Sequence, residues 1–404
     1  MTEAEKVTRR SYVKYVGGIV VVAVVAAAGY GIYQATLPTP TPTVPENWYR
    51  PELYPVPDPS MMPPSILVVD HDMLLKDEFF GIWRQLYGRW TEMKVGYNTT
   101  DADVVAKLAA GGSGIDVFHQ DTVYWWPAVQ SDLAEPLDLN KIPNYKYTFD
   151  FFKEPTAPQQ YQGKTYGVPF IIWKDGLSYN TKEVDVPPEE ATLDLLFNPD
   201  VNKKYGAKIG MFAGHETVLA AGLYLDMPNV LDMTDEELKK VEKVLMDQRK
   251  YVRVYWESSS DLQGLFITGE VNRAWTWETA VTGANKEGGG KVNFVFPLTK
   301  SPSGGKGCLG GFEGLGMAKG LDEKHKYAAY HFLNYVAGDD YAYQIFKYWN
   351  YRPANKLALE RMTPEQVKER GLEDPKAFLD SLVLWAFVPR MNKYDELMTK
   401  VKAG

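Results

Sequence analysis

Residues 168–180 have the sequence Val-Pro-Phe-Ile-Ile-Trp-Lys-Asp-Gly-Leu-Ser-Tyr-Asn, an apolar run with a polar exit. Pro169 excludes a helix at the start of this run and biases Val168 toward an extended conformation. The Phe, Ile, Ile and Trp residues that follow favour a strand. Taken alone, the run predicts one core strand among many. A sharper interpretation is a strand that crosses from one lobe of the protein to another, and the rest of the chain decides between the two.

The composition narrows the class of protein. A length of 404 residues allows two domains or one large bilobal unit. The aromatic content of 13%, with 26 Tyr and 11 Trp, is high, and such residues fill cores and line pockets for organic ligands and cations. The net charge of −8 argues against a nucleic-acid partner, because phosphate binding requires clustered Lys and Arg. The single cysteine, Cys308, excludes an intramolecular disulfide and a Cys-rich zinc site, and we expect no metal or cofactor.

The N-terminal sequence predicts a segment that targets the protein to a membrane. Residues 15–33 form an uncharged run that is long enough to span a bilayer. Arg9, Arg10 and Lys14 precede it and place the N-terminus in the cytoplasm. A retained anchor and a cleaved signal peptide both fit, since residues 26–28 are alanines that could form a cleavage site and the Arg pair resembles a twin-arginine export signal. We favour a retained transmembrane helix and an extracytoplasmic protein at the cell surface.

A Pro/Thr-rich linker follows this segment. Residues 37–45 alternate Pro with Thr, and further prolines continue to Pro64. Such a sequence forms an extended, semi-rigid spacer. It would hold a folded body away from the membrane surface.

The body alternates strands with short helices. Residues 65–70, 92–97 and 115–118 predict strands, and helical periodicity separates them. This alternation predicts an α/β unit with a mainly parallel sheet, in which ligands lie beyond the carboxyl ends of the strands. A second alternation of the same kind begins after residue 180 and includes a glycine-rich strand at 309–317.

Five groups of residues stand in a characteristic order along the body. They are Ala106-Lys107-Leu108 with Ile115-Asp116-Val117, Val168-Pro169-Phe170 with Gly176-Leu177-Ser178-Tyr179-Asn180, Gly269-Glu270-Val271-Asn272 with its aromatic end at Trp277, Phe312-Glu313-Gly314-Leu315-Gly316-Met317, and Tyr351-Arg352-Pro353-Ala354-Asn355. Their order and spacing resemble those of the extracellular solute-binding proteins of ABC importers, specifically the spermidine/putrescine-binding type. Asn350 departs from the pattern, because the family has a glycine there.

The resemblance implies an α/β, two-lobed periplasmic-binding-protein-like fold of type II, with lobes joined by crossover strands. Residues 168–180 would be the first crossover. The implied domains are 1–36 as signal or transmembrane anchor, 37–64 as linker, 65–168 plus 298–338 as lobe 1, and 169–297 plus 339–404 as lobe 2.

A polyamine requires carboxylates for its ammonium groups and aromatic walls for its methylenes. The resemblance implies a ligand site formed by His71, Asp72, Asp121, Tyr124, Glu216, Trp277 and Glu313, and the crossover assignment adds Trp173. Glu313 matches the family's key acid, whereas the family commonly has an aromatic residue in place of His71. If Lys174 or Arg352 pointed into the site, the ligand would carry an anionic or polar group instead of two amines.

Structural roles compete with these assignments. Asp72 and Asp121 are also suitable helix caps, and the charge of Glu216 would favour a helix N-terminus. Trp277 would also suit a core. Glu313 is the hardest to explain structurally, because a carboxylate in an apolar strand is costly to bury without a partner.

The function that the sequence favours is capture of a small solute, a polyamine above all, and its delivery to an ABC permease in the membrane. A sugar or another small polar solute is the alternative ligand. A less favoured alternative is an extracellular carboxylate-dependent hydrolase, but no nucleophile elbow, HExxH or phosphate-loop motif is present, and we expect no enzyme. A surface or assembly protein that reuses the fold stays open.

Overall fold

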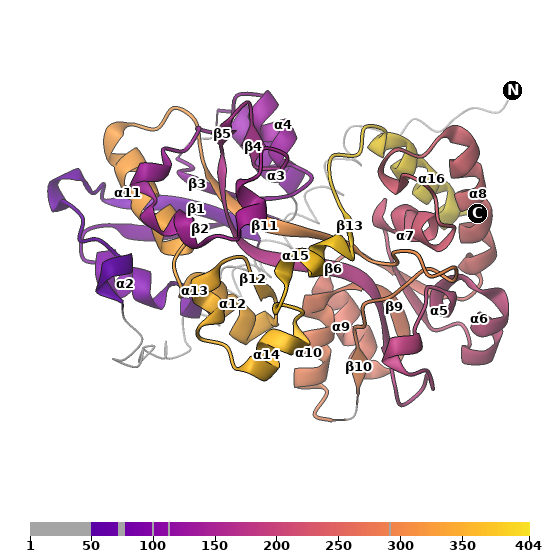
Figure 1. Cartoon of the computed structure of the whole chain (residues 1–404). Coiled ribbons are helices and arrows are strands. Elements are labelled where there is room, and N and C mark those ends of the chain that lie inside the picture. Colours follow the sequence, from indigo (N-terminus) through magenta and orange to yellow (C-terminus); the bar gives the residue numbers. More distant parts are fainter. Residues whose placement is uncertain (1–49, 72–76, 99–100, 112–113, 291) are drawn as a thin grey trace, which may run out of the picture. The chain divides into compact units, whose positions relative to one another are not determined.

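One mixed β-sheet organises the body of the protein (Figure 1). Its strand order is β2-β1-β3-β11-β6-β9-β7-β8, with β10 and β12 paired to β6 and β13 paired to β11. The computed structural model describes residues 50–71, 77–98, 101–111, 114–290 and 292–404. The sheet strands in chain order are β1 (Ser65–His71), β2 (Glu92–Asn98), β3 (Val117–Asp121), β6 (Gly167–Asn180), β7 (Ile209–Phe212), β8 (Val252–Trp256), β9 (Arg273–Trp277), β10 (Phe294–Val295), β11 (Leu309–Met317), β12 (Arg352–Pro353) and β13 (Val383–Leu384). A separate hairpin joins β4 (Gln160–Tyr161) to β5 (Lys164–Thr165).

The first group of strands is β2, β1, β3 and β11. The first three run parallel, as the alternation of strands and helices predicted, and β11 joins them antiparallel to β3. The helices of this part are α2 (Gly81–Tyr87), α3 (Asp101–Ala109), α4 (Trp125–Gln130) and α11 (Glu323–Val336). The strand expected at 115–118 lies further along, at the residues of β3.

The second group of strands is β9, β7 and β8, which pair in parallel. The helices of this part are α5 (Asp194–Phe197), α6 (Pro199–Tyr205), α7 (Glu216–Tyr224), α8 (Asp235–Arg249), α9 (Ser259–Thr268), α10 (Glu278–Glu287) and the final α16 (Met391–Ala403). Thr234 caps α8 through a capping box with Glu237, which satisfies backbone donors at the start of the helix.

The long strand β6 joins the two groups. Its first part pairs with β11 and its last part with β9, and every one of its residues is buried. The quoted stretch 168–180 is therefore the strand on which both groups of the sheet meet (Figure 1). The assignment of residues to two lobes stays a prediction.

The chain returns to β6 and β11 near its end. After α12 (Tyr341–Trp349), the short β12 pairs with β6. The small helices α13 (Lys356–Leu359), α14 (Pro364–Glu369) and α15 (Pro375–Asp380) lead to β13, which pairs with β11. The segment 385–390 then connects β13 to α16.

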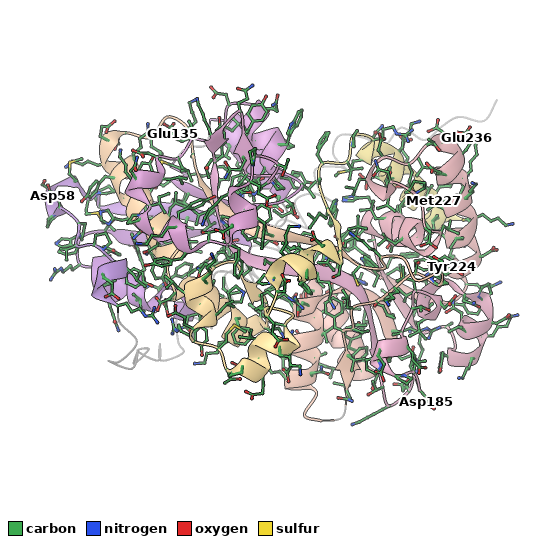
Figure 2. The ribbon with its side chains drawn as sticks, in the orientation of Figure 1. Asp58, Glu135, Asp185, Tyr224, Met227 and Glu236 are labelled. Atoms are coloured by element: carbon green, nitrogen blue, oxygen red, sulfur yellow. The ribbon has the colours of Figure 1, made fainter. Side chains whose placement is uncertain are left out.

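Residues 50–64, which the sequence analysis placed in the linker, pack onto the body. Leu53 and Tyr54 are buried, and the Leu53 carbonyl accepts hydrogen bonds from the amides of Asn144 and Asn334. Asp58, labelled in Figure 2, donates its backbone N–H to a tyrosine hydroxyl of α11. Residues 50–64 therefore belong to the folded body and not to the linker, because apolar side chains interrupt the prolines.

The predicted anchor at 15–33 lies outside the described residues. Within the described ranges, every helix is too short or too polar to cross a bilayer.

Candidate functional site

Two predicted acids lie side by side where β3 and β11 pair. Glu313 of β11 stands opposite Asp121 of β3 in the antiparallel register. Directly opposed residues of antiparallel strands project to the same face of a sheet. The Glu313 and Asp121 side chains therefore share a face, which we call the carboxylate face.

The strand β6 adds to the same face. Trp173 stands opposite Gly311 and Asp175 opposite Leu309, in register with Glu313 along β11. A Cβ atom at Gly311 would collide with the Trp173 ring, so the glycine makes room for the indole. Trp173 and Asp175 thus lie on the carboxylate face, and Asp175 is an acid that the sequence analysis did not propose.

Glu216 and Trp277 meet as a hydrogen-bonded pair. Glu216 is the first residue of α7 and Trp277 the last of β9, and the Trp277 Nε1–H donates to Glu216 Oε2 at 3.0 Å. Trp277 also stands opposite Asp175 in the sheet. Burial raises the pKa of Glu216 to about 7. The predicted acid and the predicted aromatic wall therefore belong to one local structure.

The four carboxylates Asp121, Asp175, Glu216 and Glu313 repel one another. Burial raises the pKa of Asp175 well above its ordinary value, and the charges of Glu216, Asp121 and Glu313 raise it further. The pKa of Asp121 is raised by burial and then by the charges of Asp101 and Glu313. Throughout the described part of the chain, no Lys or Arg forms an ion pair with Asp121, Asp175 or Glu216. Clustered acids without a Lys or Arg partner favour a cationic ligand.

Aromatic side chains surround these acids. Tyr351 is buried, and burial together with the charges of Glu313 and Asp175 raises the pKa of its phenol well above the usual value. Trp385 packs edge to face against Trp173, with ring centroids 6.0 Å apart. Neither was proposed as a site residue, although Tyr351 opens a motif that the sequence analysis singled out. The signal for Tyr351 was therefore present in the sequence.

Tyr124 lies close to the first pair of acids. It stands at the N-cap of α4 and is half-buried. Burial and the charge of Asp121 raise the pKa of its hydroxyl to about 12. The structure thus places Tyr124 within electrostatic reach of Asp121.

Lys174 and Arg352 have partners away from the carboxylate face. Lys174 alternates with Trp173 and Asp175, so it projects to the opposite face of β6. Its Nζ donates to the carbonyls of Phe296 and Pro297 at 2.7 and 2.9 Å and lies over the Phe296 ring.

The buried Arg352 binds Glu278 through Nη1 at 2.8 Å, and Arg370 holds the other oxygen of that carboxylate at the same distance. Lys174 and Arg352 would have argued against a diamine if they had pointed into the site. Both instead form their contacts away from the carboxylate face.

Two predicted residues cannot be placed. Asp72 lies outside the described residues, and so does the side chain of His71, whose backbone ends β1. Their roles stay predictions. Within the described ranges, no group of three or more His, Cys, Asp or Glu side chains has the arrangement of a metal site.

Two cavities lie away from the four carboxylates. One of about 540 Å³ is lined by residues of α10 and by Phe296 and Arg370, on the side of Lys174 and Arg352. The other, of about 200 Å³, lies beyond the end of α7 beside Met227 (Figure 2). None of the four carboxylates lines either cavity, so we define the candidate site by these carboxylates and the aromatic rings beside them.

Known proteins resemble this chain over most of its length. The putrescine-binding periplasmic protein PotF of Escherichia coli is 27% identical over 327 residues, which are 78% of this chain and 86% of the relative. In the fold comparison, the spermidine/putrescine ABC transporter substrate-binding protein PotD from Streptococcus pneumoniae matches with a TM-score of 0.69 at 17% identity, over 84% of this chain and 99% of that one. The binding protein MotA of A. tumefaciens, solved in complex with glucopine, matches with a TM-score of 0.61 at 19% identity, over 84% and 100% of the two chains.

These matches confirm the α/β periplasmic-binding-protein-like fold. They also confirm the resemblance to the spermidine/putrescine type. Proteins of this kind bind substrates for transport and are not enzymes. The family model for bacterial extracellular solute-binding proteins matches residues 89–376, and the chain belongs to that family.

Proposed function

We propose that the protein captures a polyamine such as putrescine or spermidine on the carboxylate face and delivers it to an ABC permease. The observation that carries this proposal is the convergence of Asp121, Asp175, Glu216 and Glu313 with no Lys or Arg ion pair to the first three in the described part of the chain. Each ammonium group would form charge-assisted hydrogen bonds with these oxygens. The sequence likeness to a putrescine-binding protein agrees with this ligand class.

Aromatic rings would cover the carbon chain of the ligand. Trp277 is fixed by its bond to Glu216 and by edge-to-face packing on Trp256, with centroids 4.9 Å apart. Trp173 is held against Trp385. Rings held in this way can pack against methylene groups and stabilise adjacent ammonium groups without losing their own freedom on binding.

The remaining parts of the proposal concern location. The family places the protein outside the cytoplasm. The apolar run at 15–33 would anchor it to the membrane, and the Pro/Thr-rich residues that follow would give it reach toward a permease.

The test is a ligand screen on the full-length chain in detergent, read as thermal stabilisation and by calorimetry. Putrescine and spermidine should raise the melting temperature, because a ligand that binds only the folded state stabilises it. The matched control is 1,4-butanediol, which has the same carbon chain as putrescine with hydroxyls in place of ammonium groups. Stabilisation by butanediol or by sugars, with no response to amines, would replace the polyamine with a neutral polar solute.

A further inference from the structure

A buried histidine stands behind Glu313. His119, in the middle of β3, is fully buried. Its Nδ1 lies 3.0 Å from Asp101 Oδ1, at the start of α3, and 3.6 Å from Asp70 Oδ1 of β1. Its Nε2 forms an ion pair with Oε2 of Glu313. A single imidazole thus contacts carboxylates from three other elements.

This geometry favours protons on both ring nitrogens, because each nitrogen faces a carboxylate. A neutral imidazole has one N–H and one lone pair, so it would turn a lone pair toward a carboxylate oxygen on one side. Burial alone would lower the pKa of the ring, but the charges of Asp70, Glu313 and Asp101 outweigh it and raise the pKa well above its ordinary value. The surrounding carboxylates thus favour the imidazolium form of the ring.

Acidic and aromatic side chains make up the described surroundings of His119. The Tyr341 hydroxyl donates to Asp70 Oδ2 at 3.3 Å, and the Phe170 ring of β6 lies edge to face with the imidazole at 6.1 Å. Asp121, two residues further along β3, also feels the charge of His119. The charged groups described around the ring are thus carboxylates, and Glu313 is the one that also belongs to the carboxylate face.

The contact with His119 leaves part of the Glu313 carboxylate available to a ligand. Its side chain keeps 15% of its exposure, whereas that of His119 keeps 1%. A carboxylate can accept about four hydrogen bonds, and the contact with His119 engages one oxygen. Glu313 can therefore bind His119 on its inner side and a further donor on the carboxylate face.

We propose that His119 is a positioning residue for ligand capture, whose ring holds Glu313 in the orientation that receives an ammonium group. The proposal rests on the proposed function.

The test is a double-mutant cycle on the full-length chain, with putrescine affinity measured by calorimetry. His119→Gln should weaken binding about tenfold when Glu313 is present and by less than about twofold in a Glu313→Gln background, because interacting residues are not additive. The control His325→Gln removes a histidine whose Nδ1 lies 2.7 Å from Asp116, a contact of the same kind away from the carboxylate face, and should change affinity by less than about twofold. Equal penalties of His119→Gln in both backgrounds would overturn the positioning role alone.

A second measurement does not depend on a variant that folds. The chain has five histidines, so nitrogen-15 spectra of labelled histidine can resolve each ring. In the ligand-free chain His119 should show two protonated nitrogens at pH 7. A neutral His119 ring at that pH would overturn the proposal even if amines bind. A wild-type chain that binds no amine would overturn the proposed function, and the positioning role with it.

Discussion

At the scale of single residues, the buried acids of the candidate site lower the free energy of unfolding when they are ionised and no ligand is bound. Glu216 shows this most clearly, since burial moves its pKa from 4.5 to about 7. Between these values the folded protein binds more protons than the unfolded chain. The free energy of unfolding therefore falls as the pH rises through this window, by up to about 3 kcal/mol from this residue.

We expect Glu216→Gln to flatten that dependence. Denaturant unfolding of the ligand-free protein across this window should show a smaller loss of stability in the variant than in the wild type, because the glutamine has no proton to lose. The matched control is Glu236→Gln, which changes an exposed acid in the first turn of α8 (Figure 2). An unchanged slope in Glu216→Gln would show that another group carries the dependence.

The residue scale also explains why Lys174 could have been assigned from the sequence. Strand alternation puts Lys174 on the face opposite Trp173 and Asp175, so a strand prediction already separates them. The same alternation places Asp175 on the face of Trp173 and so identifies Asp175 as an acid of the site. The partners of Lys174, two backbone carbonyls more than a hundred residues away, could not be predicted from any local pattern.

At the scale of elements, the segment 50–64 behaves as part of the fold. The Tyr54 hydroxyl donates to the buried Asp339, and Tyr54 packs against Tyr335 with ring centroids 5.9 Å apart. Composition alone gave no sign of this, because prolines dominate the segment and only a few apolar residues anchor it.

We expect a chain that begins at Arg50 to be markedly more stable than one that begins at Ser65. Loss of the buried Leu53 and Tyr54 alone should cost about 3–5 kcal/mol, as large core truncations do. Denaturant melts of the two chains would measure the difference. Tyr54→Phe in the longer chain separates the hydrogen bond from the packing and should cost about 1 kcal/mol. Equal stability of the two chains would mean that the segment only covers a fold that is complete without it.

At the scale of the whole molecule, the acids come from both groups of strands. Asp121 and Glu313 belong to β3 and β11, Glu216 and Trp277 belong to α7 and β9, and Asp175 lies on β6 between them. A diamine placed among them would replace repulsion across β6 by attraction to a shared cation, and such differential contacts shift a conformational equilibrium.

We therefore expect the radius of gyration, measured by small-angle scattering, to fall when putrescine is added. Butanediol should leave it unchanged. Glu313→Gln and Glu216→Gln should each reduce the change, one from either side of β6. A radius that stays constant at saturating putrescine would mean that capture involves no closure.

Much of the architecture could be predicted from the sequence. Local patterns in a fixed order predict the strand at 168–180, the alternation of strands and helices, and the family. The site was harder, since Glu216 and Trp277 are 61 positions apart and meet through a bond that only the fold reveals. His119 was missed for the same reason, because its three acid partners come from β1, α3 and β11.

The position of β11 between β3 and β6 also affects the order in which the sheet can form during synthesis. The neighbour of β3 in the sheet, at residues 309–317, is synthesised long after β3 itself. The pairing of β3 with β11 cannot form until that segment is available, and pairing over such separations is slow. His119 must wait with it, because Glu313 arrives on the same strand. The charge cluster of the site therefore cannot be complete in a newly made chain until residues 309–317 have been synthesised.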